Sequence, residues 1–401
     1  MATRLQAASF AIPRILYWYY PQLPVAWNPI TSKLNVNYST RGWLTWLYLL
    51  FNAFLVALGD LYVVTTHFKG KNRPNFGPTH IFLFVCGGAF VVTVCVMVGI
   101  LMRCARDAEK GYNELFSLSH EMKRKFQPDN PLGASKALHP DMTGVLMCAI
   151  AFSLSAPTPI IVLFVVFGNF DVITFISADI LPKETLCLTS TTLVLYLLRL
   201  WIVGGSVIEV FRSLAFFFPV LGFALMNFLD CITMLDKIED PVTFLRYYLR
   251  LSANYRIIRG VLQDVTLVLI SVAFWGTVGA MWVVVEGYGM MLPLFYGCFV
   301  GGVIMAIVIT GLFVRIIRLG LSRQEGMMER RRMEAKELFK KRKTKHTKYV
   351  TKRMEALRII QIWVGNFIPL TLQFAINYVD NLVERAVDLI LMFDMKHFIT
   401  I

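Results

Sequence analysis

Six polar side chains near the carboxyl terminus have types and a spacing suited to guiding cations. They are Gln373, Asn377, Asp380, Asn381, Glu384 and Asp388. A helix turns by about 100° per residue, which places all six within an arc of about 100°. The opposite arc is apolar and holds Ala375, Val379, Leu382, Val383, Ala386, Leu389, Ile390 and Phe393. The pattern predicts an amphipathic final helix at roughly 374–393.

An ionisable group inside a membrane span costs at least about 2.5–3.5 kcal/mol and therefore faces protein or water. Several copies of the chain around an axis would enclose water, and a ring of Glu384 and Asp388 would then attract cations. Two alternatives stay open. The carboxylates could pair with Arg199 or Arg385, or the helix could lie along the membrane surface and leave only six spans.

Other residues capable of chemistry show no catalytic or metal-binding pattern. The six histidines lie in or near loops, and the seven cysteines are scattered, mostly within apolar runs. Neither set has metal-ligand spacing, and the cysteines indicate no disulfide framework. We therefore expect no enzyme activity, no metal and no cofactor.

The composition indicates that much of the surface faces lipid. Only 16% of the residues are charged and 56% are hydrophobic, whereas a soluble domain carries about 25% charged residues. The net charge of +14 comes from basic residues between apolar runs, so we expect no nucleic-acid partner. Helical spans of about 20 apolar residues are predicted at 43–66, 79–102, 143–167, 186–208, 263–286, 291–317 and 359–393. The last is expected to break near Gly365 and Pro369.

The distribution of Lys and Arg sets the expected orientation. The amino-terminal segment and the even-numbered loops carry 32 of them, and the opposite side carries 5. Basic residues stay on the cytoplasmic side, so we expect an all-α multi-pass protein of the plasma membrane with a cytoplasmic amino terminus and an extracellular carboxyl terminus. A cytoplasmic segment at 1–42 would precede a six-helix bundle at 43–317, a basic helical loop at 318–358 and the final span at 359–401.

The apolar stretch 213–235 leaves one ambiguity, because it is either a further span or an extension of the fourth helix. We expect the extension, with cytoplasmic helices at about 209–262, because an eighth span would move the most basic loop to the outer face. In that loop, residues 323–358 alternate acidic and basic side chains with helical spacing. This favours a solvated helix, with inter-subunit docking as the alternative and anionic lipid headgroups as further partners.

Two familiar classes of polytopic protein fit poorly. The expected orientation is opposite to that of G-protein-coupled receptors, and the chain lacks their Asp-Arg-Tyr and Asn-Pro-x-x-Tyr motifs. We therefore expect no G-protein partner. Transporters often contain paired halves, and no such repeat is present, although a transporter or a structural partner subunit remains the alternative.

Trp27-Asn28-Pro29 stands before the first expected span, and Gly365-Asn366-Phe367 lies in the seventh. Together with the expected topology, these segments resemble the arthropod gustatory receptor family and the related insect odorant receptors. The final-span signature of the family is Thr-Tyr, five apolar residues and Gln-Phe. Here Arg385-Ala386 precedes the apolar run Val387–Leu391, and Met392-Phe393 follows it. The resemblance is therefore to a divergent member.

This resemblance implies a ligand-gated, non-selective cation channel that is a homo- or hetero-tetramer, with the end of the seventh helix lining the pore. It also implies a chemosensory role in taste, with a small organic tastant or odorant as ligand. Its pocket would lie among the outer halves of the spans. Aromatic candidates there are Tyr62, Phe82, Phe84, Phe164, Phe167, Trp282, Tyr288, Phe295 and Tyr296.

Overall fold

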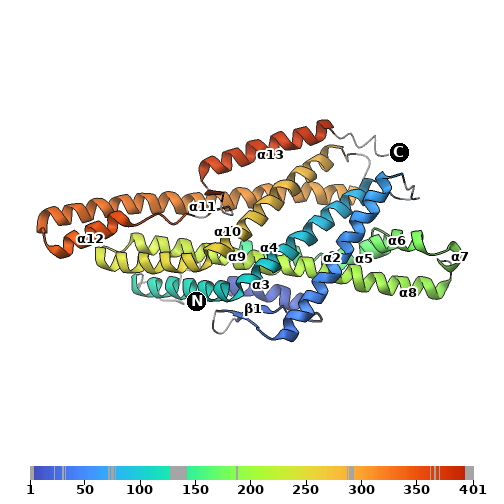
Figure 1. The fold of residues 1–401 in the computed structure, drawn as a ribbon, viewed down its shortest axis with the longest axis horizontal. Coiled ribbons are helices and arrows are strands. Elements are labelled where there is room, and N and C mark those ends of the chain that lie inside the picture. The colour runs from blue at the N-terminus through green and yellow to red at the C-terminus, as the bar shows by residue number, and fades with distance from the viewer. Residues whose placement is uncertain are drawn as a thin grey trace.

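The computed structural model is an elongated bundle of long helices (Figure 1). It describes residues 4–392, apart from 22, 29–30, 32, 71–72, 74–75, 77, 127–141, 187, 287, 289–292, 362, 365–366 and 370. Within these residues the only strands form two short antiparallel hairpins. The all-helical membrane fold expected from the composition is thus confirmed.

The amino-terminal segment packs into the bundle. Helix α1 (Arg4–Leu16) is followed by strands β1 (Val25–Asn28) and β2 (Lys33–Val36), which pair with Val25 opposite Val36. Asn113 of helix α3 (Pro78–Phe126) holds the hairpin by accepting a hydrogen bond from the Leu34 N–H and donating one to the Leu34 carbonyl, both at 2.8 Å. Trp27 is buried, and its ring stacks on Phe10 with centroids 5.0 Å apart. This apolar contact fixes the segment against the spans.

Five helical stretches in the described residues are long and apolar enough to cross a membrane, at Thr40–Phe68, Leu83–Phe126, Gly144–Ile180, Thr189–Asp236 and Pro241–Val285. They correspond in order to the first five predicted spans. The third stretch was predicted as a single helical span. In the structure it is divided into α4 (Met142–Ser155), α5 (Thr158–Phe167) and α6 (Val172–Ile180). Pro157 and Pro159 follow the first break, and proline cannot continue the hydrogen-bond ladder of a helix.

The first span is helix α2 (Thr40–Phe68). It begins at the N-cap Ser39, whose hydroxyl accepts a hydrogen bond from the Gly42 N–H.

The second span continues far beyond the predicted boundary. Helix α3 (Pro78–Phe126) has a kink at Cys104 and then runs beside α10 (Pro241–Glu286). Gly111 permits this close approach, because a Cβ atom there would lie 1.9 Å from Ile258.

The fourth span also continues, as predicted. After the short α7 (Lys183–Leu186), the helices α8 (Thr189–Arg199), η1 (Leu200–Gly204, a π-helix) and α9 (Gly205–Asp236) form one uninterrupted run. Its 48 residues reach about 72 Å at 1.5 Å per residue, more than twice the thickness of a bilayer core. Glu209 and Arg212 form a buried ion pair of 2.5 Å where α9 passes α2, and Trp46 donates a hydrogen bond to Glu209.

The ends of α3, α9, α10 and α11 beyond the predicted spans, together with α12, form one region that we call the extension lobe (Figure 1). It includes the first part of α10 (Pro241–Glu286), the last part of α11 (Pro293–Arg342) and all of α12 (Lys345–Ala356). Tyr248, Phe244 and Met327 are fully buried in its core. Arg330 and Lys336 are exposed and form ion pairs with Asp236 and Glu355. The predicted solvated basic helix is therefore amphipathic and packs on its own chain.

The first half of the predicted seventh span is not a helix. Strands β3 (Trp363–Val364) and β4 (Ile368–Pro369) form a short hairpin there, and α13 begins only at Leu372 and ends at Met392. Pro369 and β-branched Ile and Val residues disfavour a helix in this stretch. Gly365 and Asn366 lie outside the described residues.

Candidate functional site

Helix α13 presents the predicted polar stripe on its surface. Gln373, Asn377, Asp380, Asn381 and Glu384 are exposed in the single chain, and Asp388 is half-buried. The stripe is linked along the helix, because Gln373 donates a hydrogen bond of 2.8 Å to the Asn377 side chain and Asn381 donates one of 2.6 Å to the Asn377 carbonyl. The structure therefore brings the six residues onto one face without covering them.

A second face of α13 attaches the helix to α10. Leu382 and Ala386 are buried there. Tyr378 packs with its ring centroid 5.5 Å from that of Phe274 on α10. These contacts orient the polar stripe away from the bundle.

A third face of α13 is apolar and exposed. It consists of Ile376, Val379, Val383 and Val387, each with 46% or more of its surface accessible. Val379 and Val383, which belong to the apolar arc expected from the sequence, are thus exposed and do not pack on the chain's own spans. The packed arc is centred on Leu382 and Ala386 and is rotated towards Tyr378, because a tyrosine ring also packs well against aromatic neighbours.

The charges on α13 are only partly neutralised. Arg385 pairs with Asp388 at 3.1 Å, and both side chains are exposed. Arg199, the other predicted partner, is buried and pairs instead with Asp171 at 2.5 Å. Among the described residues Asp380 and Glu384 have no ion pair. The charged groups of α13 are thus three carboxylates and a single guanidinium.

The predicted ligand-side aromatic residues fall into separate groups. Phe84 and Phe164 belong to one of them, which we call the aromatic cluster. Phe164 stacks on Phe170 at 5.2 Å, Phe170 on His80 at 4.9 Å, and His80 contacts Phe84 at 6.4 Å. Phe76 and Phe175 complete the cluster, with rings 5.1 Å apart.

The other candidates lie elsewhere. Phe167 stacks on Tyr196 of α8 at 5.9 Å, and Tyr62 is exposed on α2. Trp282 lies on α10, near the turn at which Tyr288 contacts Tyr296. The side chains of Phe82 and Phe295 lie outside the described part of the structure. The aromatic cluster is therefore the part of the predicted set that tertiary structure brings together.

Sequence reasoning missed His80, Phe76, Phe170 and Phe175, as well as the ion pairs beside them. Arg73 bonds to Asp179 at 2.7 Å, and Arg199 to Asp171. The spacing of His80 and Phe84, four residues apart on one helix, was the available signal for the cluster. The signal for the ion pairs was that Arg199 and Asp179 stand singly in apolar runs.

Searches with the sequence find no matching family model and no similar curated protein. The fold, in contrast, matches solved structures over almost the whole chain. For the insect olfactory receptor OR5 from Machilis hrabei in complex with eugenol, the TM-score is 0.61 at 9% identity, covering 97% of this chain and 98% of the receptor. This chain has the fold of an insect olfactory receptor.

A second structure of OR5 gives a TM-score of 0.60 at 10% identity over 96% of this chain and 97% of the receptor. The olfactory-receptor fold extends from the amino-terminal hairpin to α13, so α13 is part of it and not an appended segment. The resemblance inferred from the sequence is confirmed at the level of the fold, that of an all-helical integral membrane protein.

Proposed function

We propose that this protein is a chemosensory receptor of the insect gustatory and odorant receptor superfamily that acts as a ligand-gated, non-selective cation channel. One observation carries the proposal. In a chain with the olfactory-receptor fold, the final helix exposes a stripe of carboxylates and amides that a single copy leaves uncovered. The proposal includes seven spans, a cytoplasmic amino terminus and insertion in the plasma membrane.

The three faces of α13 support an assembly of several copies. The packed face belongs to the chain's own α10, and the polar stripe requires water. The exposed apolar face of Ile376, Val379, Val383 and Val387, which we call the valine face, lies on the side of the stripe away from Tyr378. There it would contact a neighbouring copy. Four copies around an axis would enclose the six polar positions in a hydrated lumen and bury the valines between subunits.

The charges on the stripe favour cations. Each copy would contribute Asp380, Glu384 and Asp388 against one arginine, Arg385. A ring of carboxylates raises the local cation concentration and excludes anions. One additional unit charge about 7 Å away in water changes the energy of a permeating ion by about 0.6 kcal/mol, which is roughly a threefold change in occupancy.

The proposed ligand is a small organic molecule, of the tastant or odorant kind. OR5 binds eugenol in its solved complex, and apolar sites with a few polar groups suit such molecules. The aromatic cluster around His80 and Phe170 is the site that we propose for this chain. A ligand opens the channel to the extent that it binds the open arrangement more tightly than the closed one.

The decisive experiment combines assembly with permeation. The purified chain should have the mass of four copies in detergent, and cells expressing it should pass cation currents when exposed to a tastant and odorant panel. In Glu384→Gln/Asp380→Asn, cation over anion permeability should fall about threefold or more. Glu337→Gln, which changes an exposed carboxylate on α11, serves as the matched control.

Unchanged ion permeability in the Glu384→Gln/Asp380→Asn variant would contradict the pore assignment. A monodisperse monomer without currents would favour the alternative, a transporter or a structural partner subunit, in which the pairing of Arg385 with Asp388 serves only the fold.

A further inference from the structure

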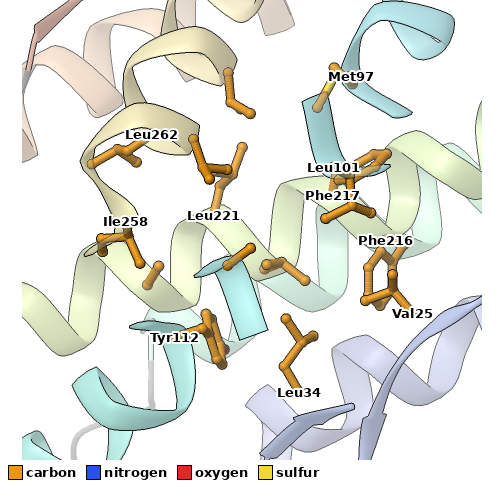
Figure 2. Close-up of a pocket in the computed structure, with 15 residues that line it drawn as sticks. Val25, Leu34, Met97, Leu101, Tyr112, Phe216, Phe217, Leu221, Ile258 and Leu262 are labelled. Carbon is orange, nitrogen blue, oxygen red and sulfur yellow. The ribbon is translucent and has the colours of Figure 1, made fainter. Parts of the chain in front are cut away.

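A cavity of about 90 Å³ lies between α3, α9, α10 and the amino-terminal hairpin (Figure 2). Met97 and Leu101 line it from α3, Phe217 and Leu221 from α9, Ile258 from α10 and Leu34 from the hairpin. It contains none of the aromatic cluster and none of α13. It is therefore a separate feature of the molecule.

The cavity is almost entirely apolar. Fifteen side chains line it, and Tyr112 is the only one of them that has a hydrogen-bonding group. A buried water needs two to four polar partners, whereas apolar cavities stay dry and take up small apolar molecules. At about 10–15 Å³ for each water-sized unit, the volume has room for about six to nine heavy atoms.

Two hydrogen-bonding groups beside the cavity are unsatisfied. The Tyr112 hydroxyl is buried and has no hydrogen-bond partner among the described residues. The same holds for the indole N–H of Trp27, whose ring meets that of Tyr112 edge-on at 6.0 Å. Buried polar groups are nearly always paired, so the unpaired hydroxyl of Tyr112, a residue that lines the cavity, would gain a partner from a ligand with one acceptor oxygen.

The location of the cavity fits entry from the membrane. Met97 and Leu101 lie at the end of the second predicted span, and Tyr112 lies beyond it, in the part of α3 that enters the extension lobe. The cavity is therefore expected near the level of the lipid headgroups. A molecule dissolved in the bilayer would reach it without crossing an aqueous phase.

We propose that this cavity is a binding site for a small, lipid-soluble molecule of about six to nine heavy atoms with a single hydroxyl or carbonyl oxygen. Phenols, short alcohols and ketones belong to this class. The hydrocarbon part fills the space between α3, α9 and α10, and the oxygen bonds with Tyr112. The site is distinct from the aromatic cluster, and its existence does not depend on ion conduction.

The test measures binding of two fluorinated probes by ¹⁹F NMR to the full chain in lipid nanodiscs, with empty nanodiscs as the baseline for partitioning. The probes are 4-fluorophenol and fluorobenzene, which differ only in the hydroxyl group. The native chain should bind one 4-fluorophenol saturably, at least threefold more tightly than fluorobenzene. In Tyr112→Phe the two affinities should become equal.

Ala224→Phe places a ring in the cavity and should weaken the saturable binding at least tenfold. Ala89→Phe, on an exposed part of α3, makes the same change elsewhere and should leave it intact. If Ala224→Phe fails to fold, Ala108→Phe fills the cavity from α3 instead. The proposal is overturned if the native chain shows no saturable binding, if filling the cavity leaves binding unchanged, or if Phe84→Ala in the aromatic cluster abolishes it.

Discussion

Individual charges in this protein have two different roles, which follow from their burial. Arg199 and Asp171 are an ion pair with side chains 6% and 0% exposed. Arg199 also donates hydrogen bonds to Asn169 and to the Val166 carbonyl. Arg385 and Asp388 pair the same two groups, a guanidinium and a carboxylate, but their side chains are 55% and 43% exposed. Only the buried pair is expected to contribute strongly to folding.

Replacing Asp171 with Asn tests this difference. The Asn side chain retains the N-cap hydrogen bond that Asp171 accepts from the Thr174 N–H, but it leaves Arg199 buried without a counter-charge. Such a loss costs about 3–5 kcal/mol, so the apparent thermal stability in detergent should drop sharply. Arg385→Gln should change it by less than about 1 kcal/mol. Equal effects of the two changes would contradict this assignment of roles.

Arg385→Gln should nevertheless alter conduction under the proposed function. Removing the guanidinium leaves Asp388 unpaired, so each subunit gains one net negative charge in the lumen. The cation conductance at low salt should rise, by about threefold or more, and the gain should shrink at high salt because ions screen the charge. Single-channel recording measures both. A fall in cation conductance would show that Arg385 has another role.

At the scale of the element, the long helices depend on a few local signals. Helix α10 begins after Asp240, whose carboxylate accepts hydrogen bonds from the Thr243 N–H at 2.9 Å and from the Thr243 hydroxyl. Pro241 occupies the first position of the helix, where proline is favoured. This cap fixes the start of the helix that carries α13.

Asp240→Ala should therefore destabilise the protein by about 0.5–2 kcal/mol. The hydrogen bonds from Thr243 hold the pKa of Asp240 below its ordinary value of 3.8. A lowered folded-state pKa means that this stabilisation is present above pH 3.8 and is lost as the pH falls through the folded value. Thermal unfolding against pH should show this acid-dependent component in the native chain and not in Asp240→Asn, which keeps a cap without the charge.

For the whole molecule, the exposed valine face of α13 makes a prediction about assembly. A cysteine at Glu384 should react with a water-soluble thiol reagent, and one at Ala386 should be protected by α10. A cysteine at Val383 should be protected in the tetramer but react once the subunits are separated in harsher detergent. The unsubstituted chain, with its native cysteines, gives the background rate. Reactivity at Val383 in the intact assembly would rule out this face as the subunit contact.

The elements themselves were readable from the sequence because hydrophobicity and helical period are local properties. The start of α13 was predicted within about two residues, and the continuation of the fourth helix was expected because an eighth span would have moved the most basic loop to the outer face. The short hairpin at 363–369 could not be predicted from the sequence, because a short run of apolar residues suits a strand and part of a span equally well.

The sequence by itself determined that the chain is a helical membrane protein with an acidic stripe near its end, since both follow from composition and spacing. Only the tertiary structure decided which face of α13 packs on α10, that Arg199 belongs to Asp171, that His80 and Phe170 join Phe84 to Phe164, and that an apolar cavity lies beside Tyr112. Each of these is a contact between residues far apart in the chain. Such partners are selected by the packing of whole helices, which no local pattern contains.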